Sequence, residues 1–150
     1  MKKLSVFVFL AAVAFSASFP TDVSAKGKKE ARLWSDSEVK WKVDAQMKDF
    51  SSAVLWGDPA KGAHGGLLKF AAGLSIPLHH HSFDNRGAVL SGTMILTLEG
   101  QPAKELGPGS LIFLPGNMKH TTACKAGTDC VIYAEQPGKD DAIMAEAPKK

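Results

Sequence analysis

Three histidines have the residue type and the spacing of metal ligands. His79 and His81 lie two residues apart in strand-like sequence, so their side chains point to the same face of a strand, about 6 to 7 Å apart. Two imidazoles at that separation can converge on one ion, with nitrogen-to-metal distances of about 2.0 to 2.1 Å. His120 begins another strand-like segment and supplies a third ring. Three histidines from two strands match a catalytic type of metal site, which keeps one position open for water or substrate.

Short strand-like runs separated by Gly, Pro and Asn have to position these rings. The runs cover residues 39–43, 53–56, 66–70, 87–90, 93–98, 110–114, 120–124 and 131–135. Regular spacing of short strands without a convincing helical stretch predicts an all-β fold, a sandwich or barrel. We expect the barrel over residues 39–138, after a loose N-terminal segment at 26–38 and before a C-terminal tail at 139–150.

Composition restricts the class of protein. The 150 residues suffice for one domain, and 45% hydrophobic with 22% charged residues is an ordinary globular composition. The formal net charge of +3 is not concentrated in a run that would follow a phosphate backbone. We therefore expect no nucleic-acid partner.

The first 25 residues have the pattern of a secretory signal peptide. A positive start at Met1-Lys2-Lys3 precedes a mostly apolar run over 4–17, and Val23-Ser24-Ala25 predicts cleavage after Ala25. The apolar run is shorter than the stretch of about 20 residues that a transmembrane helix needs. We expect an exported protein, periplasmic or secreted, without a membrane segment after cleavage.

Two cysteines, Cys124 and Cys130, flank a segment with the composition of a turn. Export would place them in an oxidising compartment, where cysteine pairs persist as disulfides. We expect the two to face each other across an antiparallel pair of strands and to form a bridge. The alternative is a reactive thiol pair, which a thiol reagent would label without prior reduction.

The residues around the histidines resemble the two sequence motifs of the cupin superfamily. The positions with the spacing of the first motif are Gly73, His79, His81, Asn85 and Gly92. The positions with the spacing of the second motif are Gly109, Pro115, Asn117, His120 and Cys124. The resemblance covers about residues 53–133 and implies a single-domain antiparallel β-barrel, a jelly roll, with one metal ion at its mouth. It also implies a homodimer.

Asn85 departs from the cupin pattern, because cupins usually have a ligating Glu at this position. An amide oxygen is a neutral, weak ligand, so three histidines would leave the full 2+ charge of the ion uncancelled. The open position should then attract an anionic ligand. Asp84 is the nearest carboxylate, although strand alternation puts it on the opposite face unless the chain turns there. Asn85 and Asp84 are the candidates for a fourth ligand or for a contact that supports the histidines.

The expected cofactor is one divalent transition metal, Fe, Zn, Mn or Ni. With iron, open positions allow substrate and O₂ to bind side by side, as the resemblance to cupin dioxygenases suggests. With zinc, the same ligands would lower the pKa of a bound water and favour hydrolase or lyase chemistry. The competing hypothesis is a non-catalytic module that binds a small ligand or a metal and acts as a sensor.

Five further residues are candidates for substrate binding. Arg86 follows Asn85 and would hold a carboxylate through two hydrogen bonds, unless it is a solvated loop cation. Tyr133 would line the barrel as an acid, unless it only packs. Phe70, Phe113 and Met118 are candidate walls of a pocket for a small, partly apolar ligand.

Overall fold

The computed structural model describes residues 30–145. The predicted signal peptide and residues 146–150 lie outside that range. The segment expected to be loose is exposed over residues 30–38, and it carries only a short 3-10 turn, η1 (Asp36–Glu38). Within residues 30–145, no helix has the length and apolarity needed to cross a bilayer.

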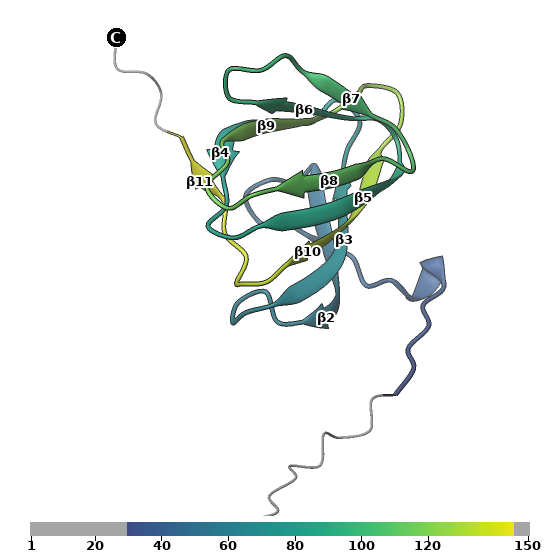
Figure 1. The fold of residues 1–150 in the computed structure, drawn as a ribbon. Coiled ribbons are helices and arrows are strands. Elements are labelled where there is room, and N and C mark those ends of the chain that lie inside the picture. Colours follow the sequence, from purple (N-terminus) through teal and green to yellow (C-terminus); the bar gives the residue numbers. More distant parts are fainter. Residues whose placement is uncertain (1–29, 146–150) are drawn as a thin grey trace, which may run out of the picture. The chain divides into compact units, whose positions relative to one another are not determined.

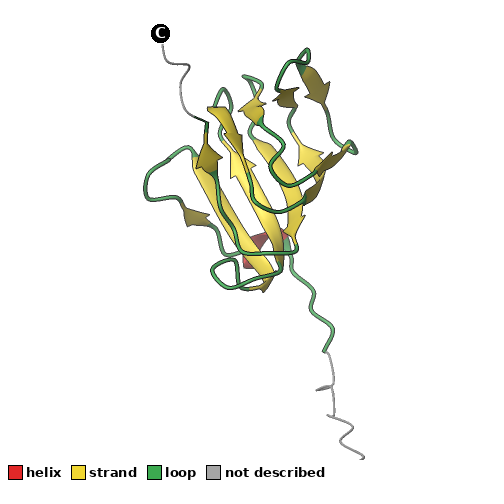
Figure 2. Cartoon of the chain, turned by 60° about the vertical axis from the view of Figure 1, so that its left-hand side comes forward, coloured by secondary structure: helices red, strands yellow, loops and turns green. Residues whose placement is uncertain are grey.

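Nearly all the regular structure of the described range is β-strand, arranged in two antiparallel sheets (Figures 1 and 2). The larger sheet has the order β1-β2-β3-β10-β5-β8 and the smaller β11-β4-β9-β6-β7. The larger sheet contains β1 (Lys42–Val43), β2 (Phe50–Gly57), β3 (His64–Phe70), β5 (Asn85–Ser91), β8 (Leu111–Leu114) and β10 (Cys130–Gln136). The smaller sheet contains β4 (Ser75–His80), β6 (Met94–Leu98), β7 (Lys104–Leu106), β9 (His120–Cys124) and β11 (Ile143–Met144). The predicted all-β jelly roll is confirmed.

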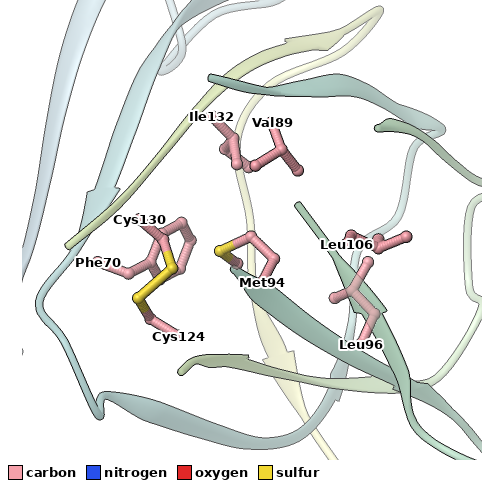
Figure 3. Close-up of a cluster of buried hydrophobic side chains, with 8 residues drawn as sticks. All are labelled: Phe70, Val89, Met94, Leu96, Leu106, Cys124, Cys130 and Ile132. Carbon is pink, nitrogen blue, oxygen red and sulfur yellow. A yellow bond between two sulfur atoms is a disulfide. The ribbon is translucent and has the colours of Figure 1, made fainter. Parts of the chain in front are cut away.

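The hydrophobic core lies between the sheets (Figure 3). Val89 lies on β5 of the larger sheet and Met94 on β6 of the smaller sheet, and each is 1% exposed. Phe70, a candidate pocket wall in the sequence, also belongs to this core and packs edge-on against Phe50, with ring centroids 5.0 Å apart. Phe70 therefore stabilises the fold, and its assignment to a ligand pocket was wrong.

The predicted disulfide between Cys124 and Cys130 is present, but it does not join two paired strands (Figure 3). Cys124 ends β9 in the smaller sheet and Cys130 begins β10 in the larger sheet. The bridge therefore ties the two sheets together, with the Cα atoms 5.7 Å apart. Cys130 is fully buried in the hydrophobic core.

The ends of the strands away from the disulfide carry the polar residues. β3 and β10 are antiparallel partners, with Phe70 opposite Cys130 at one end and His64 opposite Gln136 at the other. β4 ends at His80, and a short turn leads to Asn85 at the start of β5. The histidines of β4 and the first residue of β5 are therefore at the same end of the fold, away from the disulfide.

Candidate metal centre

The structure brings His79, His81 and His120 together. His79 of β4 is directly opposite His120 of β9, and His81 follows β4 with the same strand parity as His79. The ring centroids lie 4.3 Å apart for His79 and His120, 5.2 Å for His79 and His81, and 5.7 Å for His81 and His120. Each ring offers a nitrogen, and these nitrogens all lie within 4.8 Å of one another.

Backbone carbonyl groups hold the outer nitrogen of each of these rings. The Nδ1 of His79 is 2.7 Å from the Pro77 carbonyl oxygen, and that of His120 is 2.8 Å from the Met118 carbonyl oxygen. The Nδ1 of His81 is hydrogen-bonded to the carbonyl oxygen of Asp141. A carbonyl oxygen only accepts, so Nδ1 carries the proton in each neutral ring and Nε2 keeps its lone pair for a metal.

Burial keeps two of these rings neutral. His79 and His120 are each 3% exposed. Burial lowers the pKa of His79, although the hydrogen bond to Pro77 partly opposes the shift. Burial likewise lowers the pKa of His120 to about 4. Both rings are therefore deprotonated at neutral pH, the form that ligates a metal.

The three rings fit a divalent transition metal. Three nitrogens about 2.1 Å from one ion in tetrahedral geometry lie about 3.4 Å apart, so side-chain shifts of about an ångström would close the observed cluster around an ion. Imidazole nitrogen suits zinc, iron, nickel and copper. No carboxylate belongs to the cluster among the residues described, so these ligands are neutral.

Asn85 lies at the start of β5 and is engaged with Gln136 of β10. The Gln136 Nε2 donates to the Asn85 Oδ1 over 2.6 Å, so the amide oxygen that would replace the usual carboxylate already has a donor. Asp84 is also occupied: its Oδ1 accepts from the Gly116 N–H over 3.0 Å, and its Oδ2 pairs with Arg86 over 3.2 Å. These bonds argue against either residue as a fourth ligand.

The inner face of the larger sheet carries a row of polar residues at this end: His64, Gln136 and Asn85. Gln136 pairs with His64 and has the parity of the buried Ile132 and Cys130, so it faces inward. It is 7% exposed, and its Oε1 has no hydrogen-bond partner among residues 30–145. The row therefore offers hydrogen-bonding groups on the inner face of the larger sheet.

His64, the first residue of β3, is half-buried. Its Nδ1 lies 3.0 Å from the carbonyl oxygen of Gly62 and 3.1 Å from that of Gly138. These two acceptors place the proton of the neutral ring on Nδ1 and leave the Nε2 lone pair available.

Arg86 and Phe113 lie on the outer face of the larger sheet. They are register partners on β5 and β8, and the parity of Arg86 is opposite to that of the buried Val89. The Arg86 guanidinium lies 5.3 Å from the Phe113 ring centroid and forms an ion pair with Asp84. Strand alternation turns both side chains outward, so neither lines the interior of the barrel; for Arg86 this agrees with the alternative of a solvated cation.

Tyr133 also faces outward, opposite to the parity of Ile132 on β10. Its hydroxyl accepts from Trp56 Nε1 over 3.1 Å and donates to Glu135 Oε1 over 2.5 Å. Of the two roles expected for Tyr133, lining the barrel as an acid is therefore not the one that the structure shows. Met118 is 37% exposed, and its backbone carbonyl holds the ring of His120.

Sequence reasoning missed Asp141 and Gln136. Residues 139–150 were expected to form a tail, yet β11 pairs with β4 and Asp141 contacts His81. The contact with His81 uses the main-chain carbonyl of Asp141, and because every residue type has this group, the sequence could not predict the contact. Gln136 could have been found from alternation, because a polar residue on the inward parity of a strand calls for a partner or a function.

Residues 66–134 match the family model of the cupin domain (Cupin_2). Dimethylsulfoniopropionate lyase DddQ of Ruegeria pomeroyi is 26% identical over 106 residues, which cover 63% of this chain and 53% of that protein. The chain thus spans about half the length of this curated relative.

Solved structures show the same fold. The polyketide cyclase RemF from Streptomyces resistomycificus has a TM-score of 0.67 at 21% identity, over 80% of this chain and 89% of that one. DddQ of Ruegeria pomeroyi has a TM-score of 0.62 at 20% identity, over 76% of this chain and 64% of that one. KdgF from Halomonas has a TM-score of 0.60 at 23% identity, over 75% and 98%. The family match and these likenesses support the cupin superfamily.

Proposed function

We propose that this cupin-fold protein is a metal-dependent lyase that acts on a small anionic molecule. The observation that carries the proposal is the convergence of three imidazoles whose Nδ1 atoms are all held by carbonyl groups. His79, His81 and His120 would hold the metal through Nε2. The bound metal would supply Lewis-acid chemistry, polarising a substrate oxygen.

The charge of the site favours an anionic substrate. With three imidazole ligands and Asn85 bonded to Gln136, the ligands themselves would leave the 2+ charge of a bound ion uncancelled. A carboxylate would therefore bind favourably at an open position. Arg86 is not needed for this selection, since it faces outward.

His64 is the residue we assign to proton transfer. Its free Nε2 would accept a proton from the carbon next to the carboxylate. The C–H electron pair would then form a C=C bond, and the leaving group would depart from the next carbon with its own bonding pair. Asn85 and Gln136, in the same row, would hydrogen-bond polar groups of the substrate. One of the similar proteins, DddQ, is by name a lyase, which supports an elimination.

The test is an elimination assay on protein loaded in turn with zinc, manganese, nickel and iron. The substrates are carboxylates with a leaving group on the β-carbon, and dimethylsulfoniopropionate is tested first. NMR detects the unsaturated acid that elimination would produce. A general base contributes about 10² to 10⁴ in rate, so His64→Gln should lower kcat by that factor with unchanged metal content. His80→Gln is the matched control. Oxygen uptake by the iron form would instead identify a dioxygenase, and absence of any turnover would favour a binding module.

Export is part of the same proposal. The pattern of residues 1–25 and the disulfide between Cys124 and Cys130 both fit an oxidising compartment outside the cytoplasm. Fractionation of cells that express the full chain should recover a shortened protein beginning at Lys26 in the exported fraction. Full-length protein in the cytoplasmic fraction would contradict this.

A further inference from the structure

The three candidate ligands are not supported in the same way. His79 and His120 each bond a carbonyl two residues earlier in the chain, at Pro77 and Met118. These supports are local to β4 and β9. His81 instead bonds the carbonyl of Asp141, 60 residues further along the chain. The orientation of one ring in three therefore depends on the C-terminal segment.

Residues 138–145, the C-terminal strap, are tied to the fold at several points. The Asp140 N–H donates to the Pro59 carbonyl over 2.7 Å, and the Ala145 N–H donates to the Leu78 carbonyl over 2.9 Å. Between them, β11 lies beside β4 (Figure 1) and pairs with it, with Ile143 opposite His80. The strap thus forms the edge of the smaller sheet, beside the strand that carries His79.

Asp141 contacts the His81 region through two groups. Its carbonyl accepts from the His81 Nδ1, and its side-chain Oδ1 accepts from the Ser82 N–H over 2.9 Å. The carboxylate therefore fixes the strap to the residue next to the ligand. At the start of the strap, the Gly138 carbonyl lies 3.1 Å from the Nδ1 of His64. One short segment thus supports two histidines on opposite sheets.

We propose that the C-terminal strap is a working part of the metal centre and that Asp141 is a positioning residue for His81; this rests on the proposed metal-dependent function. The Asp141 carbonyl selects the tautomer in which His81 Nε2 is free, and it turns that nitrogen toward His79 and His120. Without the strap, the chain keeps two oriented ligands and one ring that rotates freely. Partners of this kind are typically worth about 10- to 100-fold in metal affinity.

The first measurement needs no metal. Long-range proton–nitrogen NMR of the metal-free protein reports the tautomer of each ring. In the full chain, His79, His81 and His120 should all carry the proton on Nδ1. In a chain that ends at Lys139, only His81 should change, to a mixture of tautomers. A chain that ends at Ala145 keeps the strap and is the control for shortening.

The second measurement is the Kd for zinc and cobalt, by calorimetry and by the cobalt absorption spectrum. Ending the chain at Lys139 should raise the Kd about 100-fold, and Asp141→Ala about tenfold, because the side-chain bond to Ser82 is lost. Asp141→Asn keeps an acceptor oxygen and should stay within threefold of the full chain. Thermal unfolding checks that each variant folds. An unchanged His81 tautomer in the chain that ends at Lys139, or an unchanged Kd, overturns the proposal. A full chain that binds neither metal would instead overturn the proposed function, while the tautomers still report on the strap.

Discussion

His79 and His120 are directly opposite each other across β4 and β9, and their ring centroids lie 4.3 Å apart. Cross-strand register sets this closeness, and the carbonyls of Pro77 and Met118 set the ring orientation. The pair is thus a rigid part of the fold to which His81 adds a third nitrogen. Rigid placement of ligands before binding favours metal affinity, because less side-chain freedom is lost on binding.

Removing one ring of this pair should abolish metal binding. We expect His120→Ala to take the protein from about one bound zinc to almost none, with a Kd raised at least 100-fold, because two ligands remain. Elemental analysis after dialysis measures the content. His80→Ala is the control, since His80 neighbours His79 but has the opposite parity. Full metal content in His120→Ala would contradict the site.

Stability of the metal-free protein should fall as the pH is lowered from about 6.5 towards 4. Burial lowers the pKa of His79 and His120 from the ordinary histidine value of 6.5, and for His120 the pKa falls to about 4. In this window the unfolded chain binds protons that the folded chain does not, so unfolding is favoured. The contribution is complete above pH 6.5 and lost as the pH falls through the folded values.

Urea midpoints of chelator-treated protein at pH 7, 6, 5 and 4.5 measure this dependence. His120→Gln should flatten it, because the titrating ring is gone. Hydrogen bonds with Ser82 lower the pKa of Asp141. This carboxyl therefore titrates below the range from pH 6.5 to 4 and does not contribute to the pH dependence there. A midpoint that is constant from pH 7 to 4.5 would contradict the argument.

The sequence predicted what depends on residue type and parity. The ligand trio followed from a spacing of two on one strand and from a His at the start of another, and most strands followed from short apolar runs. What could not be predicted depends on main-chain contacts and on which sheet a strand joins. The contact of the Asp141 carbonyl with His81 has no signature in the sequence, because every residue has a carbonyl. The disulfide joins the two sheets because β9 and β10, although consecutive in the chain, belong to different sheets.

The outward side chains of Arg86, Tyr133 and Phe113 show a second limit. Arg86 is close in sequence to His81, Phe113 is close in sequence to His120, and Tyr133 lies on β10, the strand that carries Gln136. Strand alternation nevertheless places all three side chains on the outer face of the larger sheet. Applying the alternation used for His79 and His81 to β5 and β10 would have selected Asn85 and Gln136 instead.

A homodimer should involve the edge strand β8. Leu111 and Phe113 are 81% and 58% exposed on the outer face of the larger sheet, and apolar surface of this kind is favourable to bury. We expect Leu111→Glu with Phe113→Glu to yield monomers in size-exclusion chromatography with light scattering. Val54→Glu, at an exposed residue of β2, is the control. A monomeric unmutated protein would rule the dimer out.

Removing the disulfide should lower the free energy of unfolding by about 2 kcal/mol, the chain-entropy value for a loop this short. The bridge closes a loop between residues six apart, and it also joins the two sheets at the core. Urea unfolding of Cys124→Ala with Cys130→Ala measures the loss. The unmutated protein under reducing conditions should unfold at a similar midpoint. Metal content should stay unchanged, since the bridge and the histidines are at opposite ends of the strands.

Placing at position 85 the carboxylate that cupins usually have there should raise the affinity for the metal and lower the affinity of the metal-loaded protein for anions. Asn85→Glu places a negative charge beside three neutral ligands, and a carboxylate is a stronger ligand than an amide. We expect the Kd for zinc to fall at least tenfold and the affinity of the loaded protein for small carboxylates such as acetate to fall by a similar factor. Calorimetric titration of each, in sequence, separates the two effects.

Asn85→Gln is the matched control, because it has the length of Glu without the charge. It should leave zinc affinity within threefold of the unmutated protein. In the Asn85→Glu variant, the Gln136 amide can still donate a hydrogen bond to the side chain at position 85, as it does to Asn85 over 2.6 Å. The stability of that variant should therefore change little. Equal zinc affinities for the Glu and Gln variants would mean that residue 85 does not reach the ion, and acetate binding unchanged by Glu would mean that the uncancelled charge does not select the ligand.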